Sequence, residues 1–210
     1  MTFDFKKAYS AYYLPPRQPG LVGLPEMRFL AVRGQGDPND PGGAYPAALQ
    51  LLYGVAYTLR MAPRTGRAIE GYFPYVVPPL EGLWEQEGST EIDYGRKADF
   101  HWISMIRLPD FVTEADFRWA VEAAAEKKGL DFSPVELFSY REGLCVQCMH
   151  LGSYDSEPET LARMLEYAGA QGCTPDVSGD RKHHEIYLSD PRRTKVENRK
   201  TVLRIPVRRG

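Results

Sequence analysis

The sequence predicts an α+β fold built from two strand-helix-strand-strand units. The segment "FLAVRGQG", a loop and "LQLLYGVAY" resemble "CVQCMHLGSY", a loop and "LARMLEYAG", because each is a strand, a glycine turn and a helix. Strand patterns follow both helices, so the two pseudo-repeats are placed at about 26–110 and 134–207. Two such units would form one antiparallel sheet with helices on one face. The other face would then be a concave ligand cleft.

The first third of the chain divides into an arm, a strand and a helix. Residues 1–25 are rich in Tyr and Pro and are predicted to be an irregular arm, ahead of a single domain over residues 26–210. Residues 26–36 predict a strand that ends at glycines, and the Asp-Pro-Gly-rich stretch after it predicts a loop. Residues 44–61 are apolar almost all round, which is typical of a helix buried on a sheet.

The middle of the chain carries strand patterns and a well-marked helix. Residues 69–77 and 98–108 are predicted strands, and residues 78–90 a loop between them. Thr113 begins a capping-box pattern, and Gly129 follows two lysines at the other end of the helix.

The last third predicts a hairpin, a helix and a further strand. "PVELFSY" and "LCVQCMHL" flank "REG", a pattern typical of a hairpin. Ser156 begins a helix with one apolar stripe, formed by Leu161, Met164, Leu165 and Ala168. Residues 183–189 alternate as a strand does, and Thr194 is a candidate cap for a short final helix. The basic tail after it is interpreted as solvated surface.

Composition narrows the class of protein. The 210 residues suffice for one large domain or two small ones, and 43% of them are hydrophobic. The formal net charge of -2 argues against non-specific nucleic-acid binding. Three cysteines, no signal-peptide pattern and no apolar run long enough to span a bilayer together predict a cytoplasmic protein.

Common cofactor and metal motifs fail on spacing. Cys145 and Cys148 match C-x-x-C but stand three apart on a predicted strand, so their sulfurs should point to opposite faces. The pair His184-Glu185 lacks the second histidine of a zinc-protease helix, since position 188 is Leu. "GQGDPN" lacks the third glycine of a dinucleotide loop. The sequence therefore predicts no metal site and no cofactor.

One polar strand face remains as a candidate functional site. Alternation along residues 183–189 places His184, Ile186 and Leu188 on one face and His183, Glu185 and Tyr187 on the other. If the second face lines a groove, Glu185 and Tyr187 enter it together. Glu185 could equally be a surface residue with a basic neighbour across the strand.

Aromatic residues that could line such a groove are spread over the chain. Tyr53 and Tyr57 are one helical turn apart and so share a face. The other candidates are Trp84, Trp102 and Tyr154, and any of these rings could equally belong to an ordinary core. Tyr154 precedes the helix that carries Glu157, whose carboxylate at a first helical turn would be favourable without any function.

Several motifs together resemble one known family. "FLAVRGQGDPN", "LYGVAYTL", "PPLEGLW", "KADFHWISMIRLPDFVT" and "HHEIYLSDPRR" are similar to segments of the GyrI-like proteins, stand-alone relatives of the small-molecule-binding domain of multidrug-responsive regulators. The resemblance runs from about Pro25 to Val207. It implies a duplicated strand-helix-strand-strand fold with a cleft between the repeats. It also implies that aromatic rings hold flat, hydrophobic or cationic compounds beside a buried glutamate, which is Glu185 here.

The branch with "HWISMIRLPDF" and "HEIYLSDPRR" resembles cyclopropanoid hydrolases. These open the cyclopropane ring of DNA-alkylating natural products by adding water, which detoxifies them. The resemblance implies a planar hydrophobic substrate stacked between aromatic walls formed by Trp84, Trp102 and tyrosines.

Three groups are candidates for the chemistry of such a hydrolysis. Glu185 is the expected base for the attacking water, while Glu157 could orient that water or donate a proton to the substrate oxygen. Tyr187 is another candidate donor. The alternatives are a non-catalytic protein that binds or senses drugs and a protein that modulates DNA gyrase.

Overall fold

The computed structural model describes residues 2–86, 92–93, 95–179 and 181–210. It confirms a mixed α+β fold with an antiparallel sheet, but this sheet closes on itself. Six strands follow one another in the order β4-β1-β3-β2-β6-β7, and β7 pairs with β4 to close a barrel. The strands are β1 (Gly20–Gln35), β2 (Leu80–Gln86), β3 (Phe100–Arg107), β4 (Glu136–Leu151), β6 (His183–Tyr187) and β7 (Lys200–Arg209), with a short β5 (Cys173–Pro175) added at β7.

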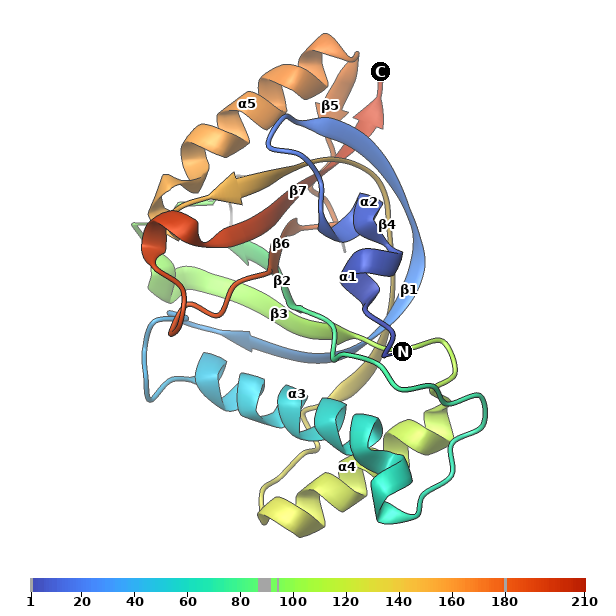
Figure 1. Cartoon of the computed structure of the whole chain (residues 1–210). Helices are drawn as coiled ribbons and strands as arrows, with labels where there is room; N and C mark the ends of the chain where they lie inside the picture. The colour runs from blue at the N-terminus through green and yellow to red at the C-terminus, as the bar shows by residue number, and fades with distance from the viewer. Residues whose placement is uncertain (1, 87–91, 94, 180) are drawn as a thin grey trace.

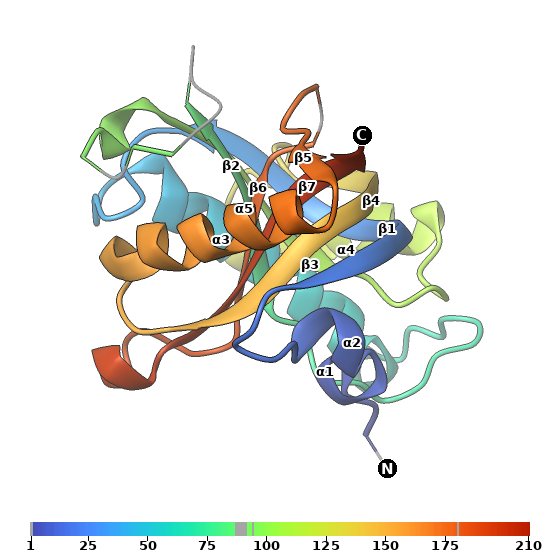
Figure 2. The same ribbon diagram turned by 90° about the horizontal axis from the view of Figure 1, so that it is seen from above.

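Among the described residues, three long helices pack against the outside of this barrel (Figure 1). They are α3 (Ala44–Met61), α4 (Glu114–Lys128) and α5 (Glu157–Ala170). Two one-turn helices, α1 (Phe5–Ala8) and α2 (Ser10–Tyr13), lie within the curve of the long strands β1 and β4. Seen from above, α5 runs across the strands on one side of the barrel, and the N-terminal helices lie away from it (Figure 2). No helix in the described part of the chain is long and apolar enough to cross a membrane.

Short 3-10 turns link several of these elements. They span Ala62–Thr65, Lys97–Asp99, Tyr154–Ser156 and Val196–Asn198. The helix α4 has the predicted cap: the Thr113 side chain accepts from the Asp116 backbone N–H, and Asp116 accepts from the Thr113 backbone N–H. Gly129 ends this helix with φ +64°, a left-handed conformation that favours glycine.

Alternation along the strands divides the apolar residues between the two sides of the barrel wall. On the outside, Met164 and Ala168 of α5 pack against Val146 and Cys148 of β4, while Cys145 faces another cluster. The predicted opposite orientation of Cys145 and Cys148 is therefore confirmed. A second outer cluster joins α3 and α4 to β1 and β3.

The barrel interior contains a buried network of charged side chains. His184 Nδ1 lies 2.8 Å from Glu142 Oε1, and His184 Nε2 lies 3.0 Å from Glu81 Oε2. Arg204 Nη1 donates to Glu142 Oε2 at 3.2 Å. Burial alone would lower the pKa of His184, but the carboxylates of Glu142 and Glu81 raise it to about 9. Within this network the carboxylates of Glu81 and Glu142 are thus balanced by His184 and Arg204, as their removal from water requires.

The N-terminal segment completes this interior. The Tyr13 hydroxyl donates to Glu81 Oε1 at 3.0 Å, and the Gln147 amide donates to the Ala11 carbonyl at 2.7 Å. Arg204 donates to the Tyr12 carbonyl. The prediction of an irregular arm over residues 1–25 was therefore wrong, because two helical turns fill the barrel and β1 already begins at Gly20.

Three other predicted elements differ from the structure. Residues 69–77 form no strand beyond an isolated bridge between Tyr75 and Phe3. Instead, strand β2 occupies 80–86, inside the predicted loop 78–90, of which 87–90 lie outside the described residues. The predicted hairpin around "REG" is the continuous strand β4. Gly143 takes φ +75° there, and the inward-facing residues change from even to odd numbers after it.

The C-terminal prediction also changes. The final helix expected after Thr194 is a 3-10 turn over Val196–Asn198, capped by Lys195 without a side-chain hydrogen bond. The basic tail is strand β7, and its Arg204 is only 1% exposed. Side chains alternate between the two sides of a strand, so Arg204 faces the barrel interior while its neighbours Leu203 and Ile205 pack against α5.

Candidate functional site

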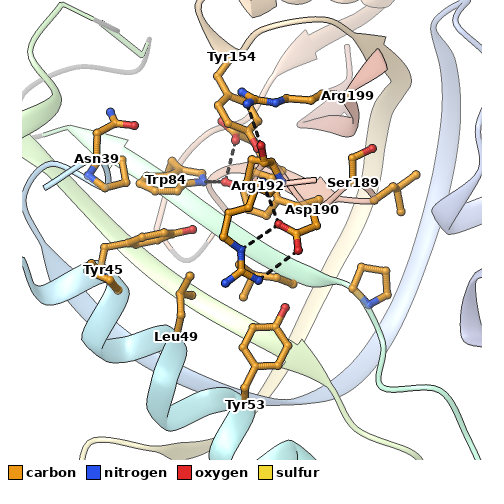
Figure 3. Close-up of a pocket in the computed structure, with 18 of the residues that line it drawn as sticks. Asn39, Tyr45, Leu49, Tyr53, Trp84, Tyr154, Ser189, Asp190, Arg192 and Arg199 are labelled. Atoms are coloured by element: carbon orange, nitrogen blue, oxygen red, sulfur yellow. Dashed lines mark hydrogen bonds and ion pairs between the residues drawn. The ribbon is translucent and has the colours of Figure 1, made fainter. Parts of the chain in front are cut away.

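A cavity of about 1170 Å³ lies on the outer side of the barrel wall. Its wall is formed by α3, β2, β6, the turn before α5 and the loop between β6 and β7 (Figure 3). The residues used below are Tyr45, Leu49, Tyr53, Tyr57, Trp84, Phe100, Tyr154, Glu185, Tyr187, Asp190, Arg192 and Arg199. The predicted cleft on a helix-free face is therefore wrong. Closure of the sheet fills its inner face with side chains, so the cavity lies on the same face as α3 and α5.

One face of α3 forms a long wall of this cavity. Tyr45, Leu49, Tyr53 and Tyr57 recur every four residues, so they lie one above the other along the helix. The rings of Tyr53 and Tyr57 are 6.2 Å apart, and Tyr57 is 49% exposed. Since twelve residues of helix rise about 18 Å, this wall runs from the buried end at Tyr45 to the open rim at Tyr57.

The buried end of the cavity is an aromatic corner. Tyr45 lies 5.5 Å from the Trp84 ring, and Trp84 makes an edge contact with Phe100 at 5.4 Å. Trp102 makes an edge contact with Tyr45 at 5.1 Å but is 2% exposed and does not line the cavity. Trp102 thus supports the wall from behind, where a direct substrate contact was predicted.

Glu185 lies at this corner, and hydrogen bonds hold both of its oxygens. Its Oε1 is 3.1 Å from His183 Nε2, and its Oε2 accepts from the Tyr187 hydroxyl at 2.8 Å. The Tyr187 hydroxyl in turn accepts from Trp84 Nε1 at 2.9 Å. Burial and the neighbouring Glu185 raise the pKa of Tyr187 well above its ordinary value, so its phenol stays neutral and donates.

A glycine makes room for this chain of contacts. A Cβ atom at Gly82 of β2 would lie 2.6 Å from Trp84 Nε1 and 3.2 Å from the Tyr187 hydroxyl. Both distances are shorter than ordinary contacts. The glycine in "PPLEGLW" is therefore what allows the indole and the phenol to meet above the strand.

Glu157 lies beside this cluster but does not line the cavity. It is the first residue of α5, and its side chain is fully buried. A carboxylate oxygen of Glu157, a ring nitrogen of His183 and an oxygen of Glu185 all lie within 4.8 Å of one another. The two carboxylates predicted to act together are thus neighbours in space, although 28 residues of sequence separate them.

Tyr154 and Arg199 cover the cluster from the side of α5. The Tyr154 ring makes an edge contact with Tyr187 at 5.9 Å, and the Arg199 guanidinium lies 5.8 Å from the centre of the Tyr154 ring. Burial raises the pKa of the Tyr154 phenol. At the rim, Arg192 forms an ion pair with Asp190 at 3.1 Å (Figure 3).

The structure brings most of the predicted residues together. Trp84, Tyr53, Tyr57, Tyr154, Glu185 and Tyr187 line one cavity. Tyr45 was not among the predicted residues, although its four-residue spacing from Leu49 and Tyr53 indicates a shared helix face. The contact of His183 with Glu185 was not predicted either, although the alternation of the strand places both side chains on one face.

This arrangement suits a flat apolar molecule. Aromatic rings supply stacking surface, and their faces also attract cations. A carboxylate fixed at the buried end can accept a proton or balance a positive charge. A closed barrel that carries such a cavity on its outer face has the features of a small-molecule-binding domain.

A match to a family model identifies the kind of small-molecule-binding domain. The chain belongs to the GyrI-like small-molecule-binding domain family, whose model matches residues 17–208.

Solved structures agree with this membership. An uncharacterised conserved protein from Listeria innocua is 45% identical, with a TM-score of 0.93 over 99% of this chain and 100% of that one. A protein described as a hydrolase from Listeria innocua is 42% identical, with a TM-score of 0.91 and the same coverage. The C-terminal domain of EcmrR shares the fold at 12% identity, with a TM-score of 0.55 over 92% of this chain and 98% of that one. No curated protein matches the chain.

Proposed function

We propose that this protein is a hydrolase that opens the cyclopropane ring of cyclopropanoid DNA-alkylating compounds by adding water, which detoxifies them. The fixed carboxylate of Glu185 in an aromatic cavity is the observation that carries this proposal. The 42%-identical relative described as a hydrolase supports it further. The apolar wall along α3 suits a planar substrate, whose electrophilic ring would lie at the buried end.

The reaction adds one water without any leaving group. The water oxygen forms a bond to a cyclopropane CH₂ carbon while the bond between that carbon and the spiro carbon breaks. The released electron pair moves into the conjugated dienone, whose oxygen becomes a phenolate and then takes up a proton. The product is a phenol with a primary alcohol, heavier than the substrate by one water.

Glu185 is proposed as the base that accepts the proton of the attacking water. A positioned carboxylate of this kind contributes about 10²–10⁴-fold to a rate. Tyr187 is proposed to fix Glu185, because its hydroxyl donates to Glu185 Oε2 and accepts from Trp84. This differs from the expectation that Tyr187 protonates the substrate, since its proton is already directed at Glu185.

Glu157 is proposed to assist from behind Glu185. Its buried carboxyl lies within 4.8 Å of the donor atoms of His183 and Glu185, a distance that one bridging water can span. In its neutral form it would pass a proton by way of Glu185 toward the phenolate, and as an anion it would help to orient the water through Glu185. Tyr45, Trp84 and Tyr154 would hold the flat substrate near the geometry of attack.

Mass spectrometry tests the hydrolysis directly. The purified protein is incubated with a spirocyclopropane-dienone alkylator, and a product one water heavier is expected. Glu185→Gln should lower turnover by about 10²-fold or more, while Glu166→Gln, an exposed substitution on α5, should leave it unchanged. Turnover by Glu185→Gln at the wild-type rate would refute the assignment of the base.

A non-catalytic binder of hydrophobic cations is the second candidate. The rings of Tyr45, Trp84 and Tyr154 beside the Glu185 carboxylate favour it, because such cages attract cations. Such a protein should bind planar cations more tightly than neutral dienones and return the dienone unchanged. The same mass-spectrometric assay, run beside titration with a planar cation, separates the two functions.

We also propose that the domain arose by duplication of a strand-helix-strand-strand unit. The element order β1-α3-β2-β3 followed by β4-α5-β6-β7 supports this, with α4 and β5 as additions. The cavity would then lie between the two repeats, with α3 on one side and the start of α5 on the other.

A further inference from the structure

We infer that His183, Glu185 and Glu157 form a binding site for a divalent transition-metal ion, with zinc as the best match. One imidazole nitrogen and two carboxylate oxygens converge within 4.8 Å. This inference concerns the protein without substrate and does not depend on the proposed hydrolysis.

The distances between the donor atoms fit a metal ion. His183 Nε2 and Glu185 Oε1 are 3.1 Å apart. If both atoms lay about 2.1 Å from a zinc ion, the ligand–zinc–ligand angle would be roughly 95°. This value lies between the octahedral and tetrahedral angles. Ligands on opposite sides of one ion would be about 4.2 Å apart, so small side-chain rotations would bring Glu157 into the same shell.

Charge favours a cation at this position. Two carboxylates lie side by side, with Glu157 fully buried and Glu185 7% exposed. Removing two negative charges from water is costly unless a positive charge accompanies them. A divalent ion bound by His183 Nε2 and Glu185 Oε1 would offset the cost of burying these carboxylates.

The surroundings supply what a metal site needs beyond its ligands. Tyr187 donates to Glu185 Oε2, which leaves Oε1 directed at His183 and fixes the carboxylate. Such outer contacts orient the ligands of metal sites. Glu185 also lines the cavity, so a bound ion would keep a coordination position open to water, as catalytic zinc sites do.

The sequence could not show this site. His183 and Glu185 are two positions apart on strand β6, and Glu157 lies in the first turn of helix α5. Motifs based on helical i, i+4 spacing therefore miss it.

Zinc binding is tested on tag-free protein after treatment with a chelator. Isothermal titration with zinc chloride, and metal analysis after gel filtration, should give one ion per chain. Cobalt(II) should give the visible absorption of a site with a nitrogen ligand. His183→Asn and Glu157→Gln should each weaken binding on the order of 100-fold or more. His101→Asn, which changes an exposed histidine of β3 outside the cluster, should bind zinc as the wild type does.

Unfolding curves of each variant, recorded without metal, exclude loss of fold as the reason for weaker binding. The inference is overturned if folded wild-type protein binds no zinc, or binds it no more tightly than His183→Asn does. Hydrolysis by chelator-treated protein in that case would leave the proposed function intact. Stoichiometric zinc binding without hydrolysis, in the presence or absence of zinc, would support the site and refute the proposed function.

Discussion

Replacing Gly82 by alanine tests whether the Trp84–Tyr187–Glu185 contacts depend on an empty space above β2. The new Cβ would lie 2.6 Å from Trp84 Nε1, and an ordinary contact begins at 3.4 Å. The indole must therefore retreat by about 0.8 Å. Overpacking of this kind costs about 1–3 kcal/mol. For a chain of this length, about 2 kcal/mol lowers the melting temperature by roughly 4–8 °C.

The substitution should affect turnover more strongly than stability. If the indole retreats, Tyr187 loses its donor and Glu185 loses its fixed position. A displacement near 1 Å can lower a rate by about 10²-fold, so Gly82→Ala should reduce turnover by that order.

Calorimetry and the mass-spectrometric assay measure the two effects separately. Gly23→Ala on β1 is the matched control, because a Cβ there meets nothing within 4 Å. It should melt at the wild-type temperature or slightly above, since alanine reduces the entropy of the unfolded chain. Adding Trp84→Phe to Gly82→Ala should recover stability, because the smaller ring removes the clash. Equal melting temperatures for Gly82→Ala and Gly23→Ala would refute the reasoning.

Two further predictions concern buried groups away from the cavity. Because the folded-state pKa of His184 is raised to about 9 from 6.5, its protonation stabilises the fold fully below pH 6.5. Roughly 3 kcal/mol should be lost as the pH rises from 6.5 to 9. Chemical denaturation at several pH values should show this slope, and His184→Gln should remove it; an unchanged slope would contradict the assignment. Burial raises the pKa of the Cys148 thiol to about 11 and also raises that of Cys145. Cys173 is buried as well. A thiol reagent at pH 8 should label none of these three free cysteines in the folded protein and all of them in denaturant; rapid labelling of the folded protein would contradict their burial.

Local signals in the sequence predicted the elements whose residues obey a single rule. The helix α4 has a capping box and a terminal glycine, so Thr113 and Gly129 mark its ends. The strand β6 alternates cleanly, which placed Glu185 and Tyr187 together on one face. The family motifs predicted the small-molecule-binding domain, which the family model confirms.

Errors arose where distant contacts outweigh local patterns. The strand β2 contains glycine, glutamate and glutamine, so its sequence looks like a loop; pairing with β3 and β6 makes it a strand. Its Glu81 is buried because His184 and Tyr13 reach it from elsewhere in the chain. Arg204 looked like surface for the same reason, since its partners lie far away in the sequence.

Barrel closure was also beyond the reach of local patterns. The pairing of β4 with β7 joins strands from opposite ends of the second half of the chain, and nothing in either strand alone indicates it. The expectation of an open sheet led to the wrong side for the cavity. The proximity of Glu157 to Glu185 likewise depends on how α5 begins beside β6.

The contacts of the N-terminal segment with the barrel interior have a consequence for the order of folding. Arg204 donates to the carbonyl of Tyr12, two residues 192 positions apart. During synthesis, Glu142 and Gln147 therefore lack their partner Arg204 until strand β7 has been made. Contacts of such long range form late and slowly. We expect the first helical turns to remain undocked on the ribosome until β7 has emerged, because the barrel cannot close without this strand.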